Sequence, residues 1–473
     1  MQGIYDSIAN VNGIINGIVW GIPALVLIMG GGLVLTLALK GFQFRKFGYA
    51  MKNTIGKMFQ KHEAKEGEVT PFQALTTALA ATVGTGNIAG ITSAVTLGGP
   101  GSIFWLWVSA LVGMATKYSE VLLAVKYRER NAQGDWVGGP MYYIKNGLGK
   151  NWRWLGVIFC IFGGLASFGI GNAVQIGNIT DAINNAIQQF VPSAAAHAET
   201  INLVLGVILA IIVGVVLLGG IKRIGSVTEK LVPLMAAIYI VACLVVVVAN
   251  AANIPHVFAM IFKGAFTPEG ITGGAVGVSI KMCITWGVKR GVFSNEAGLG
   301  SAPIAHAASS ESNPVKQGLY GIFEVFMDTI VICTLTGLTI LLTADKIGLT
   351  YGTDPGTGLN AQALGTVFGS RAGALIIAIG LSLFALSTVL SWGLYGTRCW
   401  EFILGTKAIK PYQLIFTLLV IVGATMELTL AWDIADTLNG LMAIPNLIGL
   451  LVLTPVIVKT TKEYFVKGKD LRS

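Results

Sequence analysis

Three glycines and one asparagine interrupt an apolar stretch that could otherwise form a single membrane-spanning helix. The stretch is TALAATVGTGNIAGI at residues 77–91, and it holds Gly84, Gly86, Gly90 and the polar Asn87. Each glycine costs about 1 kcal/mol against alanine inside a helix, so we expect the helix to break here. Unwound backbone is tolerated inside a membrane only where it is buried in protein or lines a cavity. The break therefore predicts a place where backbone N–H and C=O groups meet a ligand.

Such a break suits the binding of a zwitterion or a small ion. A half-helix N-terminus favours an anionic group and bared carbonyl groups favour a cation, so Thr85 and Gly86 could take up a carboxylate. Close packing of small residues in an unbroken helix is one alternative, and a nucleotide-binding glycine loop is another. The spacing G-x-G-x-x-x-G is one residue longer than the dinucleotide fingerprint, and the stretch does not sit in a soluble βαβ unit.

Polar and aromatic side chains in other apolar runs are further candidates for substrate contact. Asn172 and Gln175 lie three residues apart on one helix face, and amides offer both donors and acceptors. An interhelical hydrogen bond is the alternative role for these two amides. Thr285, Trp286 and Gly287 lie in a second glycine-rich run, where the indole would either limit substrate size or simply pack.

Charged side chains inside apolar runs must face the protein interior and find partners. A lone charge at a helix centre costs about 2.5–3.5 kcal/mol. Glu324 and Asp328 lie four residues apart in one such run, and Lys281 and Lys117 are their candidate partners. A structural charge cluster, a gate and a proton relay are the roles that fit these residues.

The composition is that of a polytopic membrane protein. The chain has 473 residues, of which 54% are hydrophobic and only 12% are charged, against about 25% charged in soluble proteins. The net charge of +9 follows the loops and forms no single face, which argues against nucleic acid as a partner. The five cysteines lie far apart without a C-x-x-C motif, and no H-E-x-x-H motif surrounds the four histidines. We therefore expect no disulfide framework, metal centre or cofactor.

Apolar runs of about 20 residues predict an all-α protein with eleven transmembrane spans. The short run at residues 256–266 reads as an interfacial or re-entrant helix. The eleven spans are residues 17–39, 75–97, 102–125, 154–180, 201–220, 228–250, 274–300, 318–343, 372–400, 411–431 and 436–458.

Lysine and arginine gather in alternate loops and so predict the orientation of the chain. They are dense at residues 40–65, 126–153, 222–230 and 398–410 and in the tail, whereas the intervening loops hold only Lys263, Lys346 and Arg371. By the positive-inside rule the N-terminus is outside and the C-terminus is inside the plasma (inner) membrane. An odd number of spans agrees with this orientation.

The order of the spans predicts an inverted repeat within one transmembrane domain, residues 1–473. If the first span, 17–39, is an extra helix, the other ten divide into residues 75–250 and 274–458. Because five is odd, the second half must run in the opposite sense to the first. The counterpart of the first broken helix is then 274–300. Its glycines and polar residues predict a second break, and they are Thr285, Gly287, Gly291, Asn295, Gly298 and Gly300.

Two longer motifs resemble signatures of the alanine or glycine:cation symporter family. They are GGPGSIFWLWVSALVG at 98–113, which departs from the usual FWMW core at Leu106, and RGVFSNEAGLGSAPIAHAA at 290–308. The resemblance covers essentially the whole chain. It implies the LeuT-type five-plus-five fold of the amino acid–polyamine–organocation superfamily, with discontinuous first and sixth core helices. It also implies a small neutral amino acid as substrate and Na⁺, sometimes H⁺, as coupling ion.

The same resemblance implies where the cation binds. VGTGN at residues 83–87 resembles the unwound first core helix of bacterial sodium-coupled amino-acid transporters, and this alignment makes Ala80 and Val83 carbonyl ligands. In the eighth core helix, Ser387 and Thr388 resemble the fold's adjacent hydroxyl ligands, and Phe384 lends a carbonyl. Oxygen ligands suit a hard cation. The alternative is that both hydroxyls bond back to carbonyls of their own helix.

These observations together predict a secondary active symporter that imports alanine or glycine with Na⁺, or with H⁺, by alternating access. A cation-coupled transporter of another small amine or of a larger neutral amino acid is the alternative. A channel would need rings of like charge or a repeated carbonyl filter. A membrane enzyme would need a nucleophile, base and metal set, and the four scattered histidines do not offer one.

Overall fold

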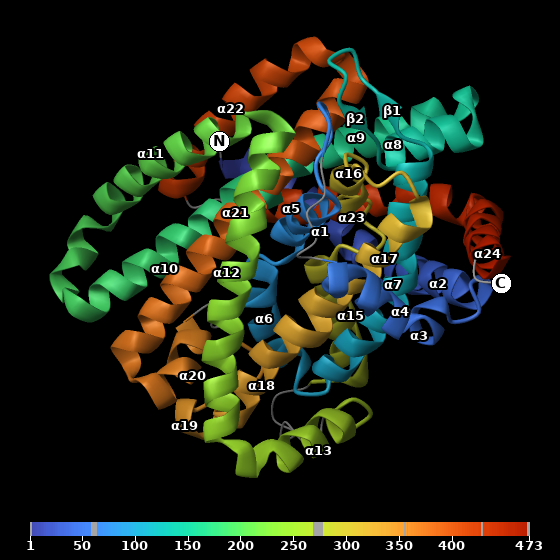
Figure 1. The fold of residues 1–473 in the computed structure, drawn as a ribbon. Coiled ribbons are helices and arrows are strands. Elements are labelled where there is room, and N and C mark those ends of the chain that lie inside the picture. The colour runs from blue at the N-terminus through green and yellow to red at the C-terminus, as the bar shows by residue number, and fades with distance from the viewer. Residues whose placement is uncertain are drawn as a thin grey trace.

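The protein is a bundle of helices with one small β-hairpin (Figure 1). The computed structural model describes residues 2–57, 64–267, 278–353, 356, 358–426 and 429–470. Among these residues the one sheet consists of β1 (Glu129–Arg130) and β2 (Trp136–Val137), which pair antiparallel with Glu129 opposite Val137.

The chain begins with two helices where the sequence predicts one span, 17–39. Gly21 is extended, and Pro23 lies in the first turn of the helix that follows, where its missing N–H costs nothing. The elements of this first part are α1 (Gln2–Val19), α2 (Ile22–Ala38), α3 (Phe42–Arg45), α4 (Phe47–Thr54) and the 3₁₀ turn η1 (Ile55–Lys57).

The predicted break in the next span is confirmed. Helix α5 (Pro71–Thr82) starts at a capping box in which Thr70 and Gln73 satisfy each other's backbone N–H groups. The 3₁₀ turn η2 (Thr85–Asn87) follows, and α6 (Ala89–Gly98) continues at an angle of 56° to α5. The bend excludes an unbroken helix packed through small residues.

The rest of the first half contains long helices joined by short turns. A π-helical segment, η5 (Gly169–Ala173), separates two helices of one 41-residue span. The elements are α7 (Ser102–Lys126), α8 (Pro140–Tyr143), η3 (Ile144–Leu148), η4 (Lys150–Trp152), α9 (Arg153–Phe168), α10 (Val174–Phe190), η6 (Pro192–His197), α11 (Ala198–Leu217), α12 (Gly220–Ala249), η7 (Ala251–Asn253) and α13 (Ile254–Gly264). Helix α13 is the short helix predicted at 256–266.

The second half also opens on a broken helix, and a third π-helical segment, η8, which follows η3 and η5 in the chain, interrupts one of its spans. Its elements are α15 (Ile280–Asn295), α16 (Ala302–His306), α17 (Pro314–Val325), η8 (Phe326–Cys333), α18 (Thr334–Leu342), α19 (Ala344–Ile347), α20 (Gly358–Phe368), α21 (Ser370–Leu404), η9 (Thr406–Ala408), α22 (Ile409–Thr425), α23 (Thr429–Val452) and α24 (Thr454–Asp470).

The second break lies later than the sequence predicts. Helix α15 passes unbroken through Gly287 and Gly291 and ends at Asn295. A Cβ at Gly287 would collide with the carbonyl of Ser102 in α7, and one at Gly291 with the Ser109 side chain. These two glycines therefore permit close helix packing, and the expectation that they interrupt the helix is wrong.

The chain turns instead just after Asn295, where three residues adopt left-handed backbone. Glu296 has φ 54°, and Gly298 and Gly300 have φ 93° and 83°. Left-handed backbone costs a residue with a Cβ about 1–2 kcal/mol, so Glu296 is held there by its contacts.

Ten of the eleven predicted spans have a counterpart among the described residues. Nine stretches of helix are long and apolar enough to cross a membrane, and the bent pair α5–α6 makes ten. The predicted span 274–300 is described only from residue 278, and its helix α15 has 16 residues. The protein is thus a multi-pass, all-helical membrane protein.

The bundle has a buried centre and an apolar rim. Of the α7 span, 83% is buried, against 33% of the spans of α11 and α12. Exposed apolar side chains on those rim helices, such as Ile211 and Val248, suit a face in contact with lipid. The β1–β2 hairpin lies at one end of the bundle, and α13, α19 and α20 lie at the other (Figure 1). Which of these two ends faces the inside of the cell stays a prediction.

Candidate functional site

The two broken helices meet at the centre of the bundle. A Cβ added to Gly86 in η2 would lie 3.2 Å from the ring of Phe293 and 3.7 Å from the Cα of Ser294. Both of these residues belong to the last turn of α15, directly before the second break. The predicted meeting of two interrupted helices is therefore present, with the contact at 293–296.

A small cavity lies at this meeting point. Its volume is about 20 Å³, room for about one water molecule. Of the predicted substrate residues, Thr85, Gly86 and Gln175 line it. The other lining residues are Ala81, Thr82, Gly84, Ile170, Phe293, Glu296, Thr388, Trp392 and Asn439.

Gln175 presents an unused hydrogen-bond acceptor at this cavity. Its Nε2 donates to the carbonyl of Ile170 at 3.1 Å. Its Oε1 is buried and has no protein partner. Thr85 and Gly86 lie in the first turn of η2, where backbone N–H groups lack intrahelical acceptors. The cavity is thus lined by residues at the start of η2, whose N–H groups lack intrahelical acceptors, and by an amide with an unused acceptor.

Two aromatic walls of the cavity are residues that the sequence reasoning missed. Trp392 is 1% exposed, and its Nε1 donates to Glu296 Oε1 at 3.1 Å. It lies one helical turn after Thr388, a spacing that could have revealed it. Phe293 and Glu296 lie inside the recognised motif RGVFSNEAGLG, three residues apart across the end of α15.

A larger cavity of about 370 Å³ leads away from the small one along α6. Thr85, Gly86 and Phe293 line both cavities, so the Phe293 ring stands between them. The Arg290 guanidinium lies 5.8 Å from that ring. The larger cavity is also lined by Ala89, Gly90, Ser93, Asn178 and Gly356.

The structure brings together four of the five predicted cation ligands. Ser387 Oγ lies 3.2 Å from the carbonyl oxygen of Ala80 and 2.8 Å from that of Phe384. Thr388 Oγ1 lies 3.0 Å from each of the same two oxygens. Val83 is the buried C-cap of α5, just before the break. The hydroxyls therefore reach back along their own helix and across to α5 at once.

Two predicted substrate residues lie close by but do not line the cavity. Asn87 accepts from the N–H of Gly84 at 2.8 Å and donates to Asp328 Oδ1 at 2.7 Å, so its amide holds the break in place. Asn172 donates to the carbonyl of Phe416 at 2.7 Å, which is the interhelical bond considered as its alternative role.

Thr285, Trp286 and Gly287, which the sequence predicts to contact the substrate, do not line the small cavity, because the second break lies about two turns further along. Thr285 lines an apolar groove between α15 and α2. Trp286 packs against Gly98 at the end of α6, and Gly287 packs against α7. Lys281 is exposed on the same groove, so it is not a partner of the buried acids.

The buried acids of α17 and η8 have other partners. Lys117 Nζ lies 3.1 Å from Glu324 Oε1, as predicted for that pair, and His306 Nε2 lies 3.2 Å from Glu324 Oε2. Asp328 accepts hydrogen bonds from Asn87, Ser294 and Thr329.

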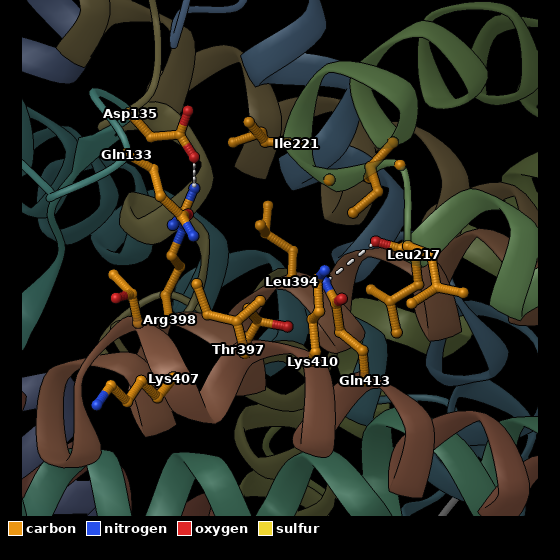
Figure 2. Close-up of a pocket in the computed structure, with 16 residues that line it drawn as sticks. Gln133, Asp135, Leu217, Ile221, Leu394, Thr397, Arg398, Lys407, Lys410 and Gln413 are labelled. Carbon is orange, nitrogen blue, oxygen red and sulfur yellow. Dashed lines mark hydrogen bonds and ion pairs between the residues drawn. The ribbon is translucent and has the colours of Figure 1, made fainter.

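A third cavity, of about 330 Å³, lies at the hairpin end of the bundle. Arg398 at its wall is 5% exposed and joins Asp135 of the hairpin loop at 3.0 Å (Figure 2). The same guanidinium binds Glu401 at 2.6 Å. This ion pair ties the hairpin to the end of α21. Among the described residues, no group of three His, Cys, Asp or Glu side chains could hold a metal ion.

Comparison with known proteins now decides the family. A family model described as "Sodium:alanine symporter family" matches residues 5–472. The chain belongs to the sodium:alanine symporter family. It is therefore a cation-coupled amino-acid symporter and not an enzyme.

Relatives within the family agree over nearly the whole chain. The sodium/alanine symporter AgcS of Methanococcus maripaludis is 47% identical over 95% of this chain and 96% of its own. The amino-acid carrier protein AlsT of Bacillus subtilis is 38% identical over 99% and 94%. The probable sodium/glutamine symporter GlnT of the same organism is 37% identical over 99% and 93%.

A solved structure shares the fold. It is a crystal structure of the Eremococcus coleocola manganese transporter in complex with an aromatic bis-isothiourea compound. The identity is 16%, the TM-score is 0.51, and the match covers 84% of this chain and 81% of the other. The likeness concerns the fold of a membrane transporter alone.

Proposed function

We propose that this symporter imports a small neutral amino acid, alanine or glycine, together with Na⁺. The observation that carries the proposal is the position of Thr388. Its side chain lines the cavity between the breaks, and its hydroxyl belongs to the oxygen cluster formed with Ser387, Ala80 and Phe384. One residue thus touches both the place for substrate and the place for cation, as coupled binding requires.

The cavity recognises both charged ends of an amino acid. The N–H groups at Thr85 and Gly86 meet the carboxylate, and Gln175 Oε1 accepts from the ammonium group. Phe293 and Trp392 limit the size of the side chain that fits. Because the cavity holds about one water in this state, the Phe293 ring must swing toward the larger cavity for substrate to enter.

The oxygen cluster suits Na⁺. Two hydroxyls make four close contacts to two carbonyls, yet together they have only two hydrogens to donate. Acceptor oxygens therefore face one another, and a hard cation would relieve that repulsion. Val83 would add a carbonyl from the end of α5. The cation would then stand at the C-terminal end of α5, where the helix dipole is negative.

The two breaks support the LeuT-type inverted repeat, with residues 75–250 and 274–458 as its halves and 17–39 as an extra helix. The bent helices α5–α6 and α15–α16 open the two halves and contact each other through Gly86 and Phe293. The positive-inside rule places the hairpin end inside and the larger cavity toward the outside.

Uptake into proteoliposomes tests the proposal. With Na⁺ outside, wild-type protein should accumulate labelled alanine, and replacement of Na⁺ by choline should abolish the uptake. Thr388→Ala should raise the Na⁺ concentration for half-maximal uptake at least tenfold. Ser391→Ala is the matched control, because Ser391 Oγ bonds across to the carbonyl of Thr77 at 2.8 Å without joining the cluster. Unchanged Na⁺ dependence in Thr388→Ala would refute the site.

Competition by glycine, serine, leucine, glutamine and D-alanine separates the main proposal from its alternative. Strong inhibition by leucine or glutamine would favour a transporter of larger neutral amino acids. Uptake in wild-type protein that ignores Na⁺ and follows a pH gradient would assign coupling to H⁺.

A further inference from the structure

Five titratable side chains form a buried cluster around the second break. Lys117, Glu120, Glu324 and His306 are each 0% exposed, and Glu296 is 4% exposed. They come from α7, α16, α17 and the turn after α15. The cluster thus holds three carboxyl groups, one lysine and one histidine.

His306 lies between Gln317 and Glu324 in this cluster. The Gln317 amide nitrogen lies 2.9 Å from His306 Nδ1, and Gln317 Oε1 accepts from the hydroxyl of Ser309 at 3.0 Å. His306 Nε2 lies 3.2 Å from Glu324 Oε2. The Lys117 ammonium group lies 3.1 Å from Glu324 Oε1, which suits an ionised carboxylate.

Glu296 is also placed as an ionised group. Its Oε1 accepts from Trp392 Nε1 at 3.1 Å, and its Oε2 accepts from the hydroxyl of Ser301. Both oxygens thus have donors. With Glu324 and Glu296 ionised, the cluster holds two negative charges against the one positive charge of Lys117.

Glu120 differs from the other two because its oxygens are used unequally. Oε1 accepts twice, from the N–H of Gly298 at 3.0 Å and from Asn446 Nδ2 at 2.6 Å. Oε2 is fully buried and has no partner. An unpaired hydroxyl left by protonation costs about 1–3 kcal/mol, whereas an unpaired buried charge costs more. The unequal use of the two oxygens is what a protonated carboxylic acid would show: Oε1 accepts two hydrogen bonds as a carbonyl oxygen does, and Oε2 carries the proton.

We propose that Glu120 is a proton-binding site of the transporter and that it carries a proton on Oε2 in this state. The unpartnered Glu120 Oε2 leaves room for a proton, and among the described residues no three His, Cys, Asp or Glu side chains converge to hold a metal ion there. Glu120 holds Gly298, at the second break, against α7 and α23. Protonation therefore stabilises the closed arrangement of that break.

The charges around Glu120 give the sign of the pH effect. Loss of its proton adds a third negative charge to a buried cluster with one lysine, so this arrangement becomes less stable as the pH rises. Within the cluster, Glu120 is surrounded by Lys117 on the same helix, Glu324 from α17, His306 from α16 and Glu296 from the turn after α15. Three further titratable groups face the cluster from the elements packed against it: Asp328 from η8, Tyr143 from α8 and Tyr395 from α21.

Infrared difference spectroscopy of purified protein tests the proton directly and does not depend on the proposed substrate. Wild-type protein near neutral pH should show the C=O stretch of a buried protonated carboxylic acid, which shifts in D₂O and fades at high pH. Glu120→Gln should remove that band, and the surface variant Glu129→Gln should keep it. Absence of the band from wild-type protein, or its survival in Glu120→Gln, would overturn the proposal.

Uptake against pH forms the second arm. Wild-type uptake should fall at alkaline pH by about tenfold for each pH unit beyond the midpoint, as expected for one proton. Glu120→Gln mimics the protonated acid and should remove this decline. A folded Glu120→Gln protein that keeps the wild-type alkaline decline would overturn the proposal. Should that variant fail to fold, the wild-type infrared titration still decides, and failure of alanine uptake in wild-type protein would count against the proposed function alone.

Discussion

At the scale of single residues, Phe293 and Trp392 set the size of the proposed substrate pocket. Shortening Phe293 to Leu enlarges the space that both cavities share. We expect Phe293→Leu to admit leucine and methionine as competitors and to weaken alanine, changing the discrimination by about 10- to 200-fold. Inhibition constants for alanine uptake measure this change.

Trp286→Phe is the matched control for that experiment. Trp286 packs against the end of α6, away from the small cavity. Its variant should keep the competitor ranking of wild-type protein. A ranking that changes in Trp286→Phe and stays fixed in Phe293→Leu would contradict the placement of the pocket.

The three glycines of the first break should tolerate alanine to different degrees, because the space available for a Cβ differs from one to the next. A Cβ at Gly84 would lie 2.6 Å from Thr388 Oγ1, and one at Gly86 3.2 Å from the Phe293 ring, whereas one at Gly90 would make an ordinary contact at 3.6 Å. We expect Gly84→Ala to impair Na⁺ dependence, Gly86→Ala to weaken alanine binding by at least tenfold, and Gly90→Ala to bind normally.

Binding measured by titration on monodisperse protein checks these three variants. The steric cost of overpacking is about 1–3 kcal/mol, which gives the expected range. Normal alanine affinity in Gly86→Ala would show that the ligand does not approach this backbone.

The residues that sequence reasoning placed well are those whose chemistry is local. The run from Gly84 to Gly86 breaks its own helix, so the break could be found without knowing its neighbours. Ser387 and Thr388 are adjacent on one helix, but the resemblance to the family was needed to single them out. Glycine was ambiguous in the second run. Close packing against α7 requires glycine at positions 287 and 291, and a sequence does not show which helices pack together.

At the scale of elements, the ion pair between Asp135 and Arg398 joins the β1–β2 hairpin to α21 (Figure 2). Breaking a buried ion pair costs about 3–5 kcal/mol, and less here because the Asp135 side chain is 27% exposed. We expect Asp135→Asn to favour opening at this end. A cysteine introduced at Thr397, in the wall of that cavity, should react faster with a thiol reagent.

Lys145→Gln is the control for the Asp135→Asn variant. It removes an exposed ion pair with Glu129 in the same hairpin region, where such pairs contribute about 0–1 kcal/mol. Labelling at Thr397→Cys should keep its wild-type rate in this background. Equal rates in the Asp135→Asn and parent backgrounds would mean that the hairpin does not close this end.

The sequence predicted elements better than their exact junctions. The lengths of the apolar runs predicted ten of the spans, and the low fraction of charged residues predicted a membrane protein. The turn at Gly21 that separates α1 from α2, and the three π-helical segments η3, η5 and η8, were not predicted. The π-helical segments change no composition or length signal, because they alter only which carbonyl each N–H bonds.

At the scale of the whole molecule, coupling between substrate and cation must be reciprocal. If Na⁺ raises the affinity for alanine by some factor, alanine must raise the affinity for Na⁺ by the same factor, because both cycles connect the same states. Thr388 lines the proposed substrate cavity and belongs to the proposed cation cluster, so we expect α21 to connect the two sites. We expect a factor of about 5–150, which corresponds to 1–3 kcal/mol.

Thermal unfolding and titration of purified protein measure this reciprocity. A ligand at 100 times its Kd stabilises the folded protein by about 2.7 kcal/mol, so Na⁺ and alanine together should raise the Tm by more than the sum of their separate effects. Choline should have no effect. In Thr388→Ala the excess should vanish, while Ser391→Ala should retain it. Purely additive stabilisation in wild-type protein would mean that the two ligands bind independently, and the shared position of Thr388 would then have no energetic consequence.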